Sequence, residues 1–212
     1  MHLRRLSSTI TALVLGAGLA AVPASAQGAE RPAPGNRSAA AVLAADSGFD
    51  RTARDFDILE SAVAAVLEAK PDSPVAVLAQ GRTRLTVFAP TDGAFRRLVE
   101  DLTGTRYAME RRVFNTLAAA AGIDTIESVL LYHVVPGATI GYREAKAANG
   151  AELATALDGA ELTVRVRHGH VFLVDADRND PNARVQPWLR NINQRNRQII
   201  HGVSQVLRPI DL

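Results

Sequence analysis

Two histidines and two serines are the residues of this 212-residue chain that could support nucleophilic catalysis. His133 lies in LLYHVV and His201 in IIHGVSQV, and Ser128 and Ser204 are the serines nearest to them in sequence. Ser204 follows His201 by three residues, and this spacing places the two side chains on opposite faces of a strand. No G-x-S-x-G nucleophile motif occurs. We therefore expect no catalytic residues, and a secreted hydrolase stays an alternative.

A second candidate chemistry is cation binding by the segment DADRND, which resembles the start of a calcium loop. Its candidate ligands are Asp175, Asp177, Asn179 and Asp180. The sixth loop position is Asp180 instead of glycine, and the twelfth is Gln186 instead of glutamate, so the motif fails. His168 and His170 lie two apart, but no third ligand accompanies them. We expect a solvated acidic loop with no metal and no cofactor, and a calcium-stabilised structural matrix protein stays an alternative.

The third candidate is a binding surface in VQPWLRNINQRNRQ, which carries the only tryptophan, Trp188. Amide and guanidinium donors surround it, and from this segment we select Trp188, Arg190 and Arg195 as candidate contacts for a protein or glycan. The alternatives are that Trp188 packs the segment onto the core and that the segment is a solvated loop. Phosphate-binding glycine motifs are absent from the sequence.

The N-terminus has the pattern of a signal peptide. Arg4 and Arg5 precede the apolar run 10–22, and Ala24-Ser25-Ala26 supplies a cleavage site. The run is shorter than the roughly 20 residues of a membrane span. We predict a signal peptide over 1–26, cleavage near Ala26, a secreted or cell-wall-associated mature chain, and no membrane insertion after cleavage. Residues 27–48, rich in alanine, proline and glycine, are predicted to be a flexible linker.

Charge and composition give little support to a nucleic-acid partner. The 24 basic and 22 acidic residues balance once Arg4 and Arg5 are removed, and no basic patch with interleaved aromatic residues occurs. The chain has no cysteine, so disulfides and thiolate metal sites are impossible and the fold depends on its core. The excess of arginine and alanine is typical of a GC-rich bacterial genome.

The helices are expected in the first half of residues 49–212, which we interpret as one domain. Apolar residues at helical spacing predict a helix over 56–69 and helices over 111–121 and 125–133, with Gly122 between the last two. LTVFAPTDGAF, residues 85–95, changes from a strand to a helix within a few residues. We expect Pro90 to end the strand and Thr91 to cap the helix. The negative charge of Asp92 is expected to interact favourably with the helix dipole, and Phe95 is expected to pack on the core.

Strands are expected in the second half, after the turn at Pro136-Gly137. Alternating or β-branched residues predict strands over 153–156, 162–166 and 171–174, with HGH at 168–170 as a hairpin turn. Residues 175–196 are interpreted as a polar loop, and 199–207 as a closing strand. Helices followed by strands indicate an α+β fold.

Three segments together resemble the signature blocks of the fasciclin domain: TVFAPTDGAF (86–95), LLYHVVPG (130–137) and IIHGVSQVLRP (199–209). The resemblance covers 54–212. It implies a compact β-sandwich or wedge with helices packed on one side, an extracellular adhesion role with protein or glycan partners, and no general catalytic activity. Tyr132 and His133 match a pair linked in the family to adhesive contacts, whereas we interpret His133 as a buried structural histidine.

The last block departs from the family pattern. Glycine is missing before His201, Gly202 replaces an apolar residue, and Ser204 stands where aspartate is usual. We count His201, with the residues of the strand-to-helix joint, as part of the structural motif. The sequence thus predicts an exported monomeric domain that acts as a non-enzymatic binding or adhesion module.

Overall fold

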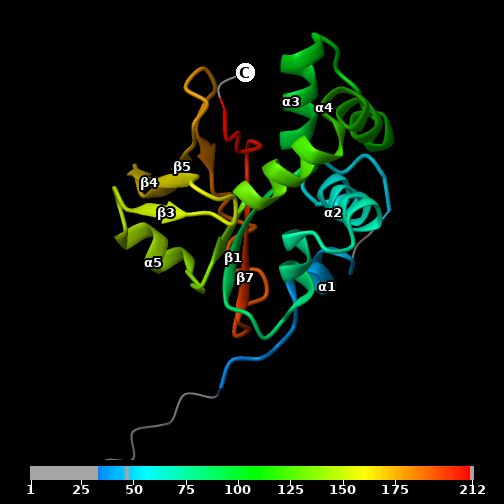
Figure 1. Cartoon of the computed structure of the whole chain (residues 1–212). Coiled ribbons are helices and arrows are strands. Elements are labelled where there is room, and N and C mark those ends of the chain that lie inside the picture. The colour runs from blue at the N-terminus through cyan, green and yellow to red at the C-terminus, as the bar shows by residue number, and fades with distance from the viewer. Residues whose placement is uncertain (1–32, 46–47, 211–212) are drawn as a thin grey trace, which may run out of the picture. The chain divides into compact units, whose positions relative to one another are not determined.

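The computed structural model describes residues 33–45 and 48–210, and the described residues from Pro34 onward form one compact unit (Figure 1). The predicted signal peptide lies outside the described residues. The helices are α1 (Ala39–Leu43), α2 (Asp57–Ala69), the 3-10 helix η1 (Pro74–Ala79), α3 (Asp92–Thr103), α4 (Glu110–Tyr132) and α5 (Tyr142–Ala147). The strands are β1 (Leu85–Pro90), β2 (Val134–Pro136), β3 (Glu152–Ala154), β4 (Glu161–Arg167), β5 (His170–Val174), β6 (Ala183–Arg184) and β7 (Gln198–Val203).

Strand β1 is the centre of a three-stranded sheet with the order β2-β1-β7. It pairs antiparallel with β2 and parallel with β7, in a register that runs from Leu85 opposite Gln198 to Pro90 opposite Val203. All residues of β1 and β7 are buried. Strands covered on both faces need apolar residues at nearly every position, which explains the apolar sequences of both. As predicted, β1 ends at Pro90.

The other strands form an antiparallel sheet with the order β3-β4-β5-β6. The turn between β4 and β5 places His168 and Gly169 at positive φ, 49° and 77°, and confirms the predicted hairpin. Buried side chains of this sheet, such as Leu162 and Leu173, pack together with Phe88 of β1. The second sheet therefore covers one face of the first.

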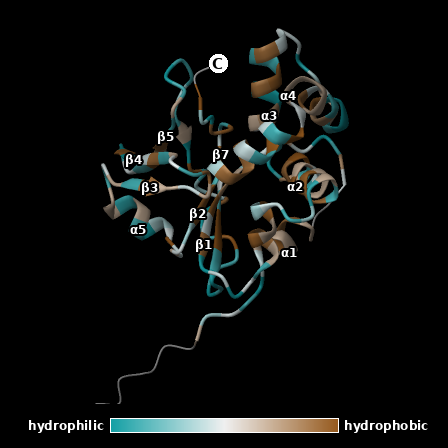
Figure 2. Ribbon diagram, in the orientation of Figure 1, coloured by the Kyte–Doolittle hydropathy of each residue, from teal (hydrophilic) through white to brown (hydrophobic). Residues whose placement is uncertain are grey.

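Helices cover the opposite face of β1 (Figure 1). Leu85, Val87 and Ala89 alternate with Phe88 along the strand and belong to the core formed with α1 to α4. Apolar colouring accordingly concentrates on the central strands and on the inner faces of the helices (Figure 2). The predicted α+β class, with helices on one side of a sheet pair, is confirmed; the short helix α5 lies beside the second sheet and was not predicted.

Helix α3 begins directly after β1, and another part of the chain satisfies its first amides. Thr91 occupies the predicted cap position, but its side chain makes no capping hydrogen bond, so that part of the prediction is wrong. The amides of Asp92 and Gly93 donate instead to the carbonyl oxygens of Asp55 and Ala53, at 3.1 and 2.9 Å. The first amides of a helix have no acceptor within the helix, so residues 53–55 cap α3.

The Asp92 side chain caps helix α2 in return. Its carboxyl group accepts hydrogen bonds from the amides of Asp57 and Ile58, at 3.2 and 2.9 Å. Phe56, at the cap position of α2, has no side-chain acceptor to offer. Burial, and then the neighbouring Asp55, raise the pKa of Asp92 to about 8, so at neutral pH the group is largely uncharged. The predicted favourable interaction between a charged Asp92 and the dipole of α3 is therefore wrong, because the Asp92 side chain is largely uncharged and caps α2.

Helix α4 is two helices joined at Gly122, which has φ 74° and ψ 167°. This break is the one that the sequence predicts. Among the described residues, α4 alone is long and apolar enough to cross a membrane by length and composition. Gly122 divides it into segments that are each shorter than the roughly 20 residues of a span.

Part of the predicted linker is folded. Within residues 33–45, helix α1 buries Ala39 and Leu43 against the helical core. Gln198 of β7 holds this segment in place: its Oε1 accepts from the Ala39 amide at 2.6 Å. Its Nε2 donates to the carbonyl oxygens of Val77 and Gln80, at 3.0 and 2.9 Å. The linker prediction is wrong for α1, because a buried side chain far along the chain satisfies its backbone.

We predict that Gln198→Ala lowers the free energy of unfolding by roughly 2–4 kcal/mol, because the buried Gln198 side chain loses three hydrogen bonds to the backbone. The amides of α1 should lose their protection from hydrogen exchange. Urea denaturation and exchange measurements test this, with the exposed Gln194→Ala as control. Unchanged protection of residues 39–43 would contradict the role of Gln198.

Candidate functional site

His133 is a buried structural residue at the end of α4. Its side chain is 2% exposed. Nδ1 lies 2.7 Å from the carbonyl oxygen of Val129, and Nε2 lies 2.9 Å from the amide nitrogen of Leu207. Nδ1 therefore donates and Nε2 accepts, which is the arrangement of a neutral imidazole. Burial lowers the pKa of His133 to about 4, so the ring stays neutral and has no nitrogen left for a substrate.

His201 is fully buried in β7 and is also held by the backbone. Nε2 lies 2.8 Å from the carbonyl oxygen of Ile140, and Nδ1 lies 3.3 Å from the amide of Asn191. Its ring stacks on Phe88 with the centroids 5.9 Å apart. The Ser204 hydroxyl accepts from the amide of Arg184 at 2.9 Å, so the structure joins neither histidine to a serine nucleophile.

Tyr132, the neighbour of His133, packs in the apolar cluster between β1 and the second sheet, which also contains Phe88 and Leu162. It is 1% exposed, and its hydroxyl donates to the carbonyl oxygen of Glu161 at 2.9 Å. Burial raises its pKa to about 12. The prediction that Tyr132 and His133 contact a partner stays untested, but both side chains lie inside the described fold. These two residues would therefore influence partner binding only indirectly, by determining the shape of the surface around them.

The acidic segment 175–180 is organised around Arg208, which is 5% exposed. The Arg208 amide donates to Asp175 at 2.9 Å, and its Nε lies 2.9 Å from an oxygen of Asp177. Its other end pairs with Asp180. These carboxyl groups face a guanidinium group of the protein, and the predicted solvated loop is thus in part a buried ion-pair network. The Arg208 guanidinium group therefore already supplies a positive charge to Asp177 and Asp180.

The segment 186–197 precedes β7 in the chain and is fixed to it by backbone hydrogen bonds. The Gln186 amide donates to the carbonyl oxygen of Gly202, and the Gly202 amide donates to that of Leu189, both at 2.8 Å. A Cβ on Gly202 would lie 2.6 Å from the Cβ of Leu189. The family departure at Gly202 is thus explained, because the glycine makes room for Leu189.

The asparagines of this segment hold the fold instead of facing solvent. Asn191 accepts from the amide of Tyr142 at 2.8 Å, at the start of α5. Asn193 donates to the carbonyl oxygens of Arg37 and Gln198, both at 2.8 Å. Asn191 and Asn193 also adopt positive φ, 56° and 65°, a conformation that asparagine tolerates better than most residues. The alternative of a solvated loop is therefore wrong for Asn191 and Asn193.

Trp188 stands out from this fixed segment with 57% of its surface exposed. The guanidinium carbon of Arg54 lies 5.6 Å from the centroid of its ring. Arg190 lies over the ring of Tyr142 at 4.9 Å, and Arg195 is exposed at φ 69°. In the described part of the chain, none of these three arginines forms an ion pair. We call Trp188, Arg54, Arg190 and Arg195 the Trp188 surface.

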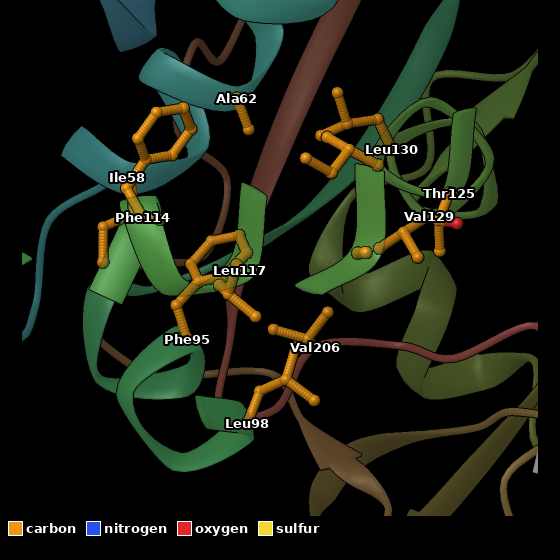
Figure 3. Close-up of a pocket in the computed structure, with 12 residues that line it drawn as sticks. Ile58, Ala62, Phe95, Leu98, Phe114, Leu117, Thr125, Val129, Leu130 and Val206 are labelled. Carbon is orange, nitrogen blue, oxygen red and sulfur yellow. The ribbon is translucent and has the colours of Figure 1, made fainter. Parts of the chain in front are cut away.

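An apolar pocket lies between α2, α3 and α4 (Figure 3). Its volume is about 70 Å³, and its walls include Ile58, Phe95, Phe114, Leu117 and Val206. Phe95 thereby packs on the helical core, as predicted. The lining contains no acid, base or amide, and binding sites for polar ligands need a few such groups to orient the ligand. The pocket therefore offers apolar contact and no catalytic chemistry.

Sequence reasoning missed Arg54 and this pocket. The helical spacing of Phe114 and Leu117 predicted a helix with an apolar face, but spacing does not reveal whether another element covers that face completely. Arg54 carries no signal in the sequence, because its partner Trp188 lies far along the chain.

We predict that His133→Ala destabilises the chain by roughly 2–4 kcal/mol at pH 7, since a buried amide and a buried carbonyl lose their partner. The folded-state pKa of about 4 lies below the unfolded value of 6.5, so the stabilisation by His133 is complete above pH 6.5. It is lost as the pH falls towards 4. Urea denaturation across this range should show the difference between wild type and variant shrinking.

The exposed His168→Asn is the matched control for this experiment, because asparagine also accepts the positive φ of residue 168. A stability difference at His133 that stays constant with pH would contradict the buried neutral imidazole.

Comparisons with known proteins found a family and a similar solved structure. The fasciclin domain profile matches residues 60–209. A solved structure described as a FAS1 domain pair from the insect cell adhesion molecule Fasciclin I is similar, with a TM-score of 0.48 and 14% identity. The match covers 73% of this chain and 48% of that one, so the chain spans about half the length of its solved relative. No curated protein matches significantly. The chain belongs to the fasciclin domain family.

Proposed function

We propose that the mature chain is an exported, non-enzymatic binding or adhesion module that contacts an extracellular protein or glycan through the Trp188 surface. The fasciclin family is known from cell adhesion molecules, which supports the adhesive role. The identity of the partner and the export of the chain belong to the proposal.

The exposure of Trp188 on a fixed segment is the observation that carries this proposal. Tryptophan and arginine are enriched among residues that dominate binding energy. A segment already ordered by β7, Asn191 and Asn193 loses little conformational entropy when a partner binds. The segment is therefore suited to present an aromatic anchor that Arg54 contacts, and it carries the exposed Arg190 and Arg195 as well.

The state of the histidines supports a role without catalysis. Both nitrogens of His133 and of His201 are engaged with backbone groups, and the pocket between the helices is lined by no acid, base or amide. General acid–base catalysis requires a group within hydrogen-bond reach of a substrate proton. Neither histidine nor the pocket therefore supplies a candidate catalytic residue for the hydrolase alternative.

Export is supported by the predicted signal peptide over 1–26 and by the typical extracellular occurrence of fasciclin domains. We propose that the mature domain acts as a monomer outside the cytoplasm, either free or associated with the cell wall.

We predict that Trp188→Ala and Arg195→Ala each weaken binding by roughly tenfold or more, as expected for a contact residue at the centre of an interface. A glycan array and a pull-down with extracellular proteins measure this for the mature chain. Leu102→Ala is the matched control, because Leu102 is a large apolar residue that is 48% exposed on α3. Equal binding by wild type and all three variants would remove the Trp188 surface as the contact.

The alternative role as a calcium-stabilised matrix protein has its own test. Because Arg208 faces the carboxyl groups of segment 175–180, millimolar calcium should leave the melting temperature unchanged. Calorimetry with and without calcium measures this. A calcium-dependent rise that disappears in Asp177→Asn would favour the matrix role instead.

A further inference from the structure

Five arginines that are scattered along the sequence come together at one end of the central sheet, beside the first residues of β1 and β7. Three segments supply them, residues 34–38, 80–84 and 193–197, and these segments meet at that end of the sheet (Figure 1). The five residues are Arg37, Arg82, Arg84, Arg195 and Arg197, and we call them the arginine surface. No segment contributes more than two of them, so the sequence alone does not reveal a basic patch.

Backbone contacts hold the three segments together. The Gly35 amide donates to the carbonyl oxygen of Arg195 at 2.8 Å, and the Arg197 amide donates to that of Gly35 at 3.1 Å. Gly81 lies so close to the first segment that a Cβ on it would overlap the carbonyl oxygen of Asn36. The arginines therefore extend from a part of the backbone that is already ordered.

Arg84 and Arg197 lie next to each other on the same face of the sheet. They directly precede Leu85 and Gln198, which are paired in the parallel ladder of β1 and β7. The ladder reaches them, since the Leu85 amide donates to the carbonyl oxygen of Arg197 at 3.2 Å. Leu85 and Gln198 both face the helical side, where they contact the core and η1. Successive side chains of a strand point to opposite faces, so both arginines face the other way.

The positive charge of the arginine surface is not balanced by the segments that build it. Four of the five side chains are exposed and Arg197 is half-buried, and none of the five forms an ion pair within the described residues. The three segments contain no aspartate or glutamate, and neither does segment 137–140, which hydrogen-bonds to Arg84 and Arg197. Charges of one sign that gather on one face attract a partner of the opposite sign.

One guanidinium nitrogen of this surface lacks the partner that a buried donor needs. Arg197 Nη1 is buried and has no hydrogen-bond acceptor among the described residues. Buried donors are almost always satisfied by the protein, by ordered water or by a bound group. Guanidinium groups match the geometry of carboxylate and phosphate groups, which they bind through two parallel hydrogen bonds. An anionic oxygen of a ligand is therefore a suitable acceptor for Arg197.

Segment 186–197 connects the arginine surface to Trp188. Leu189 lies against Gly202 near the end of β7, whereas Arg197 adjoins Gln198 at its start. At about 3.3 Å per residue, these two ends lie roughly 13 Å apart. An exposed aromatic ring and a group of arginines at this separation suit a linear polymer that offers both sugar rings and acidic groups.

The composition of the arginine surface does not favour a single-stranded nucleic acid. Its three segments contain no aromatic residue, and proteins that bind single strands stack the bases on aromatic side chains.

We propose that the arginine surface binds an anionic polysaccharide through its carboxylate or phosphate groups, and that this polymer extends along segment 186–197 towards Trp188. The choice of a polysaccharide rests on the glycan partner of the proposed function, whereas the binding of anionic groups rests on the arginine surface itself. The inference thus gives the glycan partner a negative charge.

Binding of the mature chain to three immobilised polymers tests the proposal: polygalacturonate, which carries carboxylates, a teichoic acid, which carries phosphates, and neutral dextran. We expect binding to an anionic polymer and none to dextran, and the polymer that binds identifies the anionic group. Raising the salt from about 0.15 M to about 1 M shortens the screening length from roughly 8 to roughly 3 Å, so the affinity should fall by about tenfold or more.

Two variants test the residues. Arg37→Gln combined with Arg84→Gln removes two exposed charges and should weaken binding by roughly fivefold or more. Arg197→Gln tests the buried donor and should also weaken binding. The matched control, Arg112→Gln combined with Arg167→Gln, removes the same charge from exposed positions on α4 and β4 and should bind like the wild type.

Three results would overturn the proposal: dextran bound as tightly as the anionic polymers, a double variant that binds no more weakly than its control, or duplex DNA bound more tightly than either anionic polysaccharide. Arg195 stays unchanged in these variants because it also belongs to the Trp188 surface. Trp188→Ala is measured on the same polymers. Weak binding by the arginine variants with full binding by Trp188→Ala would reject the Trp188 surface and retain the arginine surface, and the reverse result would reject the arginine surface alone.

Discussion

A buried helix start must find hydrogen-bond partners for its amides, and the fold around β1 depends on how this requirement is met. Strand β1 is covered on both faces and leads into α3 without a loop. Residues 53–55 cap α3, and the Asp92 carboxyl group caps α2. This exchange fixes two helices relative to the central strand, and it also fixes the walls of the apolar pocket and the segment that carries Arg54.

The polar residues of the family blocks serve the same purpose elsewhere in the chain. His133 joins the end of α4 to the amide of Leu207, and His201 joins β7 to Ile140. Gln198 holds α1 and η1, while Arg208 gathers the acidic segment. Because the chain has no cysteine, its distant segments are joined by buried hydrogen bonds and ion pairs, and no disulfide contributes. Trp188, by contrast, is 57% exposed, and the proposed function places partner contact there.

Local signals predicted the elements, whereas partners distant in sequence decided the roles of side chains. The break at Gly122 and the turn at His168 and Gly169 depend on backbone conformation alone, and the sequence identified both. Asp92 was expected to serve its own helix but caps α2, because its partners lie 34 and 35 residues away. Helix α1 lay in an alanine-rich stretch, and it is held by core packing and by the distant Gln198, neither of which composition reveals. The asparagines before β7 show the same limitation, since composition cannot distinguish an amide that faces solvent from one that holds the backbone.

Native-state hydrogen exchange at Ile58 and Gly93 tests the reciprocal caps most directly. Both amides lie in the first turn of their helices, where helix ends commonly fray. If the caps lock α2, α3 and β1 into one unit, both amides exchange only through global unfolding, with the same free energy as the amides at the centre of β1. Exchange of either amide through local opening, at a free energy well below the global value, would contradict the account.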